Sequence, residues 1–155
     1  MRSRDEQAQR DPECVICARG VPLDLLVELP STWVTATREA PLPGYVCVVS
    51  KIHVIELYEL RDQARHLFWD DVSTVAEAVQ RATGSPKINY EIHGNTIPHL
   101  HLHLYPRFPG DPYEGGPIDP RAGYVFRRSD EDLARLRNAI VAGLQAAAMG
   151  SSVRG

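Results

Sequence analysis

Short apolar segments separated by turn residues dominate the first third of the chain. The segments 24–29, 33–37 and 45–50 are rich in aliphatic and β-branched residues, which is typical of strands. Residues 30–31 and the Pro-Leu-Pro-Gly sequence at 41–44 interrupt them, and proline and glycine favour turns. The pattern predicts three strands in an antiparallel meander.

The remaining apolar positions predict two helices and two further strands. Apolar residues recur three and four positions apart over 62–82 and stop before a Gly-Ser-Pro sequence, which indicates a long helix. The segments 87–92 and 99–105 alternate with period two, as strands do. Ser129 precedes three acidic residues and is a good N-cap for a last helix.

This β-β-β-α-β-β-α order predicts an α+β fold, with an antiparallel sheet of about five strands and a long central helix and a C-terminal helix packed on it. A chain of 155 residues has room for one domain, which we place at 13–149. Residues 1–12 and 150–155 are predicted to be flexible tails. The segment 106–123 is dense in proline, glycine and aspartate, so we expect a long, functional loop there.

Composition and charge narrow the class of protein. A net charge of -3 argues against broad nucleic-acid binding, because that role needs a basic surface. We find no apolar stretch long enough to span a membrane and no export signal, so we predict a cytoplasmic protein without a membrane partner.

Three cysteines, Cys14, Cys17 and Cys47, are an odd number for a disulfide framework in such a protein. The spacing of Cys14 and Cys17 is that of a metal or redox motif. Cys47 lies in a predicted buried strand and is expected to be a core residue.

The most informative segment is the alternating sequence of histidine and leucine at 99–104. On a strand, His99, His101 and His103 would share one face, and the leucines would enter the core on the other. From the residues alone, a metal site built on the histidines is one interpretation of this row.

The seven residues 99–105 resemble the His-φ-His-φ-His-φ-φ signature of the histidine triad (HIT) superfamily of nucleotide hydrolases and transferases, in which φ is a hydrophobic residue. The similarity extends to the Cys-x-x-Cys at 14–17, to residues 43–53, and to Gly94-Asn95-Thr96-Ile97-Pro98. It covers residues 13 to 110.

The resemblance implies a mechanism and a site. His101 corresponds to the nucleophile that attacks the α-phosphate and forms a covalent nucleotidyl-histidine, and His103, with His99, would stabilise charge on the phosphoryl oxygens. The matching positions for substrate binding are Asn89, Gly94, Asn95 and Thr96. For Gly94 we expect a positive φ that lets neighbouring N–H groups approach the phosphate.

Two positions depart from the pattern of the family. Thr37 stands where relatives often have an Asp or Asn that binds the ribose. Tyr45 stands where a His is frequent, and we expect a packing role for it.

The charge of a polyphosphate could be offset by four basic residues, Lys87, Arg107, Arg127 and Arg128. An exposed basic residue is the default expectation for each of them.

The resemblance also implies one structural zinc ion per chain, bound by Cys14, Cys17, His53 and His99. A Cys₂His₂ set closes a tetrahedral site, which would withdraw His99 from phosphate binding. The resemblance further suggests a homodimer.

Together these features predict a HIT hydrolase that cleaves a dinucleoside polyphosphate, such as diadenosine tetraphosphate, with no magnesium requirement. Three alternatives stay open: a purine nucleoside phosphoramidase of the same superfamily, a metal-dependent hydrolase that uses the HxHxH strand, and a nucleotide-binding module without turnover. Walker, Rossmann and Nudix motifs are not found in the sequence.

Overall fold

A computed structural model of the protein describes residues 10–152. Of the two predicted tails, residues 1–9 and 153–155 lie outside this range. Within it, the Asp11 carbonyl accepts a hydrogen bond from the Cys14 N–H at 3.1 Å. The last helix, α4 (Asp130–Ser152), runs through residues 150–152.

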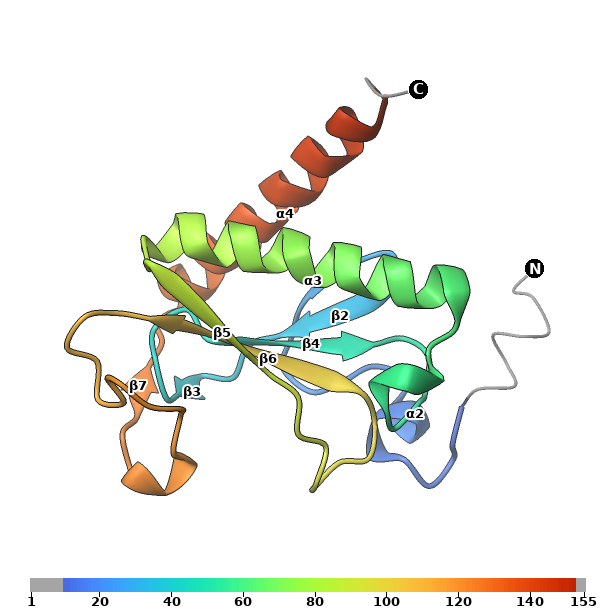
Figure 1. The fold of residues 1–155 in the computed structure, drawn as a ribbon, viewed down its shortest axis with the longest axis horizontal. Helices are drawn as coiled ribbons and strands as arrows, with labels where there is room; N and C mark the ends of the chain where they lie inside the picture. The colour runs from blue at the N-terminus through green and yellow to red at the C-terminus, as the bar shows by residue number, and fades with distance from the viewer. Residues whose placement is uncertain (1–9, 153–155) are drawn as a thin grey trace.

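The centre of the fold is a five-stranded antiparallel sheet in the order β1-β2-β4-β6-β5 (Figure 1), which confirms the predicted α+β fold. The five strands are β1 (Leu25–Glu28), β2 (Thr32–Thr35), β4 (Val46–Ser50), β5 (Lys87–Glu91) and β6 (His101–Arg107). A small second sheet pairs β3 (Glu39–Ala40) with β7 (Phe126–Arg127).

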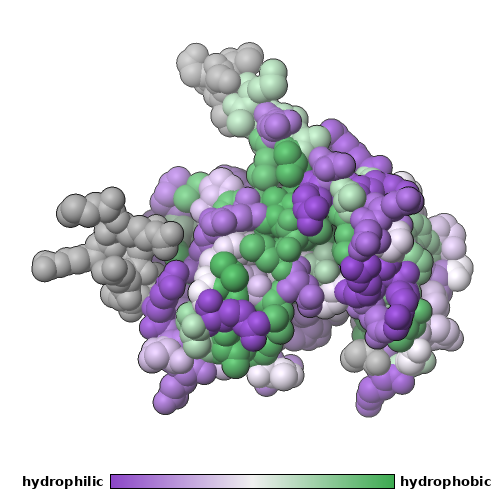
Figure 2. All heavy atoms as spheres, turned by 180° about the vertical axis from the view of Figure 1, so that it is seen from behind, coloured by the Kyte–Doolittle hydropathy of each residue, from purple (hydrophilic) through white to green (hydrophobic). Residues whose placement is uncertain are grey.

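One long helix, α3 (Asp62–Thr83), lies across one face of the sheet, and α4 packs beside it and against β1. Leu102 and Leu104 of β6 and Val72 of α3 have no exposed surface, so the core lies in this layer. Seen from behind, apolar side chains gather along α4 (Figure 2). No helix in the described part of the chain has the length and apolar character needed to cross a bilayer.

Both predicted helices are confirmed. The Ser129 hydroxyl accepts the Asp132 N–H at 3.1 Å, and the Asp132 carboxylate accepts the Ser129 N–H at 2.8 Å, a reciprocal cap that starts α4. The described residues also contain short elements that the pattern did not predict: α2 (Val15–Arg19), β3, β7 and the 3-10 helices η1 (Leu57–Glu59) and η2 (Pro120–Ala122).

The turn before β4 requires glycine at position 44. Gly44 has φ +78°, and a Cβ there would lie 2.4 Å from the Thr83 Cγ2 methyl. The Thr83 hydroxyl donates to the Val79 carbonyl at 2.8 Å, which fixes that methyl in place. The close approach joins the start of β4 to the end of α3.

We expect Gly44→Ala to lower the free energy of unfolding by about 3 kcal/mol, because left-handed backbone strain and a steric clash add. Gly110→Ala is the matched control, since Gly110 has φ +76° but open space around it; it should cost only about 1 kcal/mol. Urea denaturation measures both. A second substitution, Thr83→Ser, should recover part of the Gly44→Ala loss, and equal costs for the two alanine variants would contradict the clash.

Candidate functional site

The strand β6 presents two histidines on the sheet face opposite α3. Because Leu102 and Leu104 enter the core, alternation directs His101 and His103 to the other face, where both are half-buried. Their ring centroids lie 5.0 Å apart with planes at 83°. For these two residues the predicted one-sided placement is confirmed.

The predicted strand begins two residues too early, but the alternation of faces holds at His99 as well. Leu100 joins Leu102 and Leu104 in the main core, whereas His99 contacts Cys14, which packs with Cys47 and Val49 in a smaller apolar cluster on the other face. The strand begins at His101 rather than at 99, and His99 lies in the bend before it with 1% of its surface exposed. The Leu100 N–H donates to the Val54 carbonyl at 2.7 Å, and the Leu100 carbonyl accepts from the Ser50 N–H at 3.0 Å. These bonds hold the bend that leads into β6.

A backbone carbonyl fixes the tautomer of His101. The His101 Nδ1–H donates to the carbonyl oxygen of His99 at 2.7 Å. In the neutral ring, Nε2 therefore carries no proton and has its lone pair free. The geometry gives His101 a nucleophilic nitrogen.

Three polar side chains surround His103. The Tyr45 hydroxyl lies 2.8 Å from His103 Nδ1, and the ring of His93 has its centroid 5.6 Å from that of His103. The carboxylate of Glu91, which is paired with His103 across the sheet, lies 2.9 Å from His93 Nε2. Burial and the neighbouring imidazoles lower the pKa of His103 to about 4, so its ring is neutral at pH 7.

The sequence did not assign a polar role to Tyr45 or Glu91. The position of Glu91 could have been predicted from the alternation of β5. Ile88 faces the core, so Glu91, three residues later, faces the other side of the sheet, where it pairs with His103. Tyr45 precedes the first residue of β4, so only the folded structure reveals its contact with His103.

The predicted substrate residues divide into two groups. Asn89 is half-buried on the same face of β5 as Glu91, and its register partner on β6 is Tyr105. Gly94, Asn95 and Thr96 lie in the loop between β5 and β6, in which Asn95 and Thr96 are exposed. Gly94 has φ +81°, which confirms the expected positive φ.

The basic residue Arg107 organises the segment that follows β6. Its guanidinium contacts both oxygens of Asp111 at 2.8 and 3.0 Å and donates to the carbonyls of Tyr113 and Gly116 at 2.6 and 2.7 Å. Hydrogen bonds from Arg107 hold the pKa of Asp111 down at about 2. Arg107 therefore fixes this loop and is not an unpaired cation. The loop and Asn89 border an open groove of about 510 Å³.

The expectation of an exposed side chain is wrong for Arg128, which has 1% of its surface exposed. Its Nε–H donates to the Thr37 carbonyl at 2.8 Å, and its guanidinium also donates to the Tyr45 carbonyl. The Thr37 hydroxyl itself donates to the Glu39 carbonyl at 2.6 Å. The Thr37 carbonyl therefore helps to hold the buried Arg128 guanidinium, while the Thr37 hydroxyl bonds to the backbone of Glu39.

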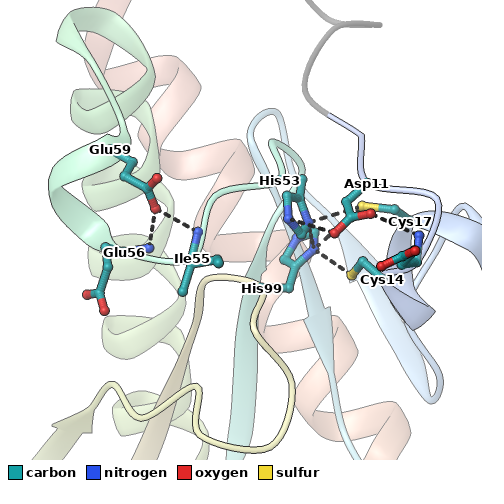
Figure 3. Close-up of polar contacts among 9 residues, drawn as sticks. Asp11, Cys14, Cys17, His53, Ile55, Glu56, Glu59 and His99 are labelled. Atoms are coloured by element: carbon teal, nitrogen blue, oxygen red, sulfur yellow. Dashed lines mark hydrogen bonds and ion pairs between the residues drawn. The ribbon is translucent and has the colours of Figure 1, made fainter.

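A second cluster lies where His99 points. The helix α2 is capped by Cys14 and contains Cys17, and the three-residue spacing puts both thiols on one side of it. The Sγ atoms of Cys14 and Cys17 lie 3.5 and 3.7 Å from His99 Nδ1, and the Sγ of Cys17 lies 3.4 Å from His53 Nδ1. The two Nδ1 atoms are 3.2 Å apart, and all four donor atoms lie within 4.8 Å of one another (Figure 3).

The histidines of this cluster are oriented by further contacts. The His99 Nε2–H donates to the Ser50 carbonyl at 2.7 Å, which leaves Nδ1 unprotonated and directed at the cysteines. Burial lowers the pKa of His99, so the ring is neutral. An oxygen of Asp11 lies 3.8 Å from His53 Nε2, and Figure 3 shows the Asp11 carboxylate beside His53 on the side of the cysteines. The four residues can hold one metal ion.

The donor set also matches a tetrahedral ion in size. Bond lengths of about 2.0–2.1 Å to nitrogen and about 2.3 Å to sulfur give tetrahedron edges of about 3.3 Å between nitrogens and about 3.6 Å between nitrogen and sulfur. Four of the six separations among the donor atoms, 3.2 Å and 3.4–3.7 Å, agree with those edges, and all six lie within 4.8 Å. Cys47 is no part of the cluster; burial raises the pKa of its thiol to about 12, as expected of a core residue.

Comparison with protein families gives a match to the HIT domain over residues 19–110. No curated protein matches the chain significantly.

Solved structures share the fold. A histidine triad protein from Sinorhizobium meliloti is 24% identical, with a TM-score of 0.69, 77% of this chain covered and 88% of the other. One from Marinobacter aquaeolei is 25% identical, with a TM-score of 0.68 and coverages of 79% and 88%. A Zn-bound histidine triad family protein from Mycobacterium smegmatis is 23% identical, with a TM-score of 0.63 and coverages of 87% and 97%.

Proposed function

The chain belongs to the HIT domain family, and from that premise we propose that it hydrolyses a dinucleoside polyphosphate at the α-phosphate through a covalent intermediate on His101. The observation that carries the proposal is the 2.7 Å hydrogen bond from His101 Nδ1 to the His99 carbonyl. That bond leaves Nε2 as an unprotonated nucleophile.

The reaction proceeds in two displacements. The lone pair of His101 Nε2 attacks the α-phosphorus, a nitrogen–phosphorus bond forms, and the bond from that phosphorus to the bridging oxygen breaks, releasing a nucleoside polyphosphate. Water then attacks the same phosphorus, the nitrogen–phosphorus bond breaks, and a nucleoside monophosphate leaves. His103 stabilises charge on the non-bridging oxygens in both steps.

Asn89, Gly94, Asn95 and Thr96 are proposed to bind the phosphates. Asn89 lies on the sheet face of His103, and the other three lie in the loop that also carries His93, whose ring is beside His103. Counter-charge from Arg107 is not part of this proposal, because its donors already bind the loop that follows β6.

The length of the sheet face favours a substrate with two nucleosides. From His101 to Arg107 the strand spans about 20 Å at roughly 3.3 Å per residue. The groove beside Asn89 continues this face beyond the histidines and leaves room for a second nucleoside. Diadenosine tetraphosphate is therefore the proposed type of substrate, and an adenosine phosphoramidate is the alternative.

The ion held by Cys14, Cys17, His53 and His99 is proposed to be one structural zinc per chain. Support comes from the donor separations and from the neutral, oriented His99 ring. Zinc bound by four protein ligands supplies folding energy and no open position for water. We propose a homodimer in the cytoplasm, where a reducing environment keeps both cysteines as thiols.

The structure favours this mechanism over a metal-bound hydroxide at the triad. Among the described residues, the one group of three or more potential metal ligands contains neither His101 nor His103. The Nδ1 atoms of both rings are already hydrogen-bonded to protein groups.

The test is a cleavage assay on diadenosine tetraphosphate and adenosine phosphoramidate, with and without magnesium. We expect AMP and ATP from the first compound without added magnesium, an oxygen-18 label from water in AMP alone, and an adenylyl-enzyme after rapid quenching and intact mass spectrometry. Exposure to chelator must be brief, so that loss of a structural ion does not imitate magnesium dependence. Strict magnesium dependence without an adenylyl-enzyme would refute the mechanism, whereas faster phosphoramidate cleavage would change only the substrate.

A further inference from the structure

The contact between Tyr45 and His103 is more specific than packing requires. The Tyr45 hydroxyl lies 2.8 Å from His103 Nδ1, a hydrogen-bond distance. The two rings are also stacked, with centroids 5.9 Å apart and planes at 15°. Tyr45 therefore determines the environment of one nitrogen of His103.

The chemistry of the two groups determines the direction of this hydrogen bond. Burial raises the pKa of the Tyr45 hydroxyl, so the phenol keeps its proton, and burial keeps the His103 ring neutral. A phenol is a better donor than a neutral imidazole, and an unprotonated imidazole nitrogen is a good acceptor. Tyr45 therefore donates to Nδ1, and the proton of His103 is at Nε2.

The two histidines of β6 are then held in opposite tautomers. His101 donates from Nδ1 to a carbonyl and has a lone pair at Nε2, whereas His103 accepts at Nδ1 and has an N–H at Nε2. The strand thus places a nucleophile beside a hydrogen-bond donor, with ring centroids 5.0 Å apart.

Buried neighbours hold the Tyr45 ring in place. The Arg128 guanidinium donates to the Tyr45 carbonyl and lies 6.0 Å from the centre of its ring. The ring of Tyr105 stacks on that of Tyr45, with centroids 4.8 Å apart and planes at 15°. These contacts keep the phenol directed at His103.

We propose that Tyr45 is a positioning residue that fixes His103 as its Nε2–H tautomer, so that the neutral ring donates a hydrogen bond to a non-bridging oxygen of the attacked phosphate. The second half of the proposal rests on the proposed function, whereas the tautomer itself does not. Tyr45 acts through His103 and does not touch the substrate.

The tautomer is tested without substrate. Nitrogen-15 NMR of the histidine side chains at pH 7 should show protonated Nε2 and unprotonated Nδ1 for His103 in the native protein. In Tyr45→Phe, which keeps the stacked ring, the two His103 nitrogen shifts should move toward the average of a tautomer mixture. An Nδ1–H tautomer in the native protein, or no change in the variant, would overturn the proposal.

The consequence for catalysis is tested separately with the substrate that the native protein cleaves. Tyr45→Phe should lower kcat by about 10- to 100-fold, because the donor to the phosphate is no longer fixed, and should change KM by less than about threefold. Tyr113→Phe, at a buried tyrosine of the same aromatic cluster, is the control and should retain native kcat. An unchanged kcat in a folded Tyr45→Phe protein would refute the role of Tyr45 while leaving His101 as the nucleophile.

Discussion

Replacement of His101 by asparagine is expected to lower kcat by at least about 10⁴-fold, because the variant has no nitrogen nucleophile at the position of Nε2. The remaining polar groups, including His103 and Asn89, still line the sheet face, so nucleotide binding should survive. Calorimetric titration with AMP should give a dissociation constant within about fivefold of the native value, since the change removes a transition-state interaction rather than ground-state binding.

The matched control is His66→Asn. His66 is an exposed residue of α3, on the far side of the core from the site, so this variant should retain native activity. The His101→Asn protein must be prepared free of wild-type enzyme, which would dominate any residual rate. A clean preparation with even a tenth of native kcat would show that another group is the nucleophile. Intact mass spectrometry of the quenched reaction should then still show an adenylyl group on the variant.

The elements and faces that were predicted correctly depend on local periodicity. The alternation of histidine and leucine fixed the faces of His101 and His103, because Leu102 and Leu104 have to be buried. The stripe of apolar residues gave α3, and the Ser129 cap gave the start of α4. In each case the decisive interaction lies within a few residues along the chain.

The features that were missed depend on contacts between distant segments. The strand β6 begins at His101 rather than at 99 because the Leu100 N–H bonds to the Val54 carbonyl in the connection after β4, which no local pattern reveals. Arg128 is buried by carbonyls of Thr37 and Tyr45, more than eighty positions away in sequence. The pairing of β3 with β7 is equally non-local, and each strand is too short to show an alternating pattern of apolar and polar residues in the sequence.

Loss of the metal is the other change with a large expected effect, and it acts on stability first. We expect the untagged protein, expressed in zinc-supplemented medium, to contain about one zinc per chain by elemental analysis. Cys17→Ser removes one of four ligands, and structural sites of this type bind with apparent energies of roughly 10–16 kcal/mol. Since the main core of the domain is separate from this cluster, we expect only part of that energy in the unfolding free energy, about 5 kcal/mol, or a fall in Tm of about 10–20 °C.

The control is Cys47→Ala, which removes a buried thiol from the same hydrophobic cluster without removing a ligand. It should keep one zinc per chain and lose much less stability. Chelator should lower the Tm of the native protein to that of Cys17→Ser and should leave the Tm of Cys17→Ser unchanged, because the ion acts only through the intact site.

His99 connects the metal site to the proposed nucleophile, His101. The His99 side chain belongs to the metal cluster, and its carbonyl accepts the Nδ1–H of His101 at 2.7 Å. Release of the ion frees the His99 ring and loosens that carbonyl, so kcat of Cys17→Ser, measured well below its Tm, should fall as well. A zinc-free native protein with full stability would instead identify Cys14 and Cys17 as ordinary thiols of the smaller core and would leave the hydrogen bonds of the bend as the sole support of His101.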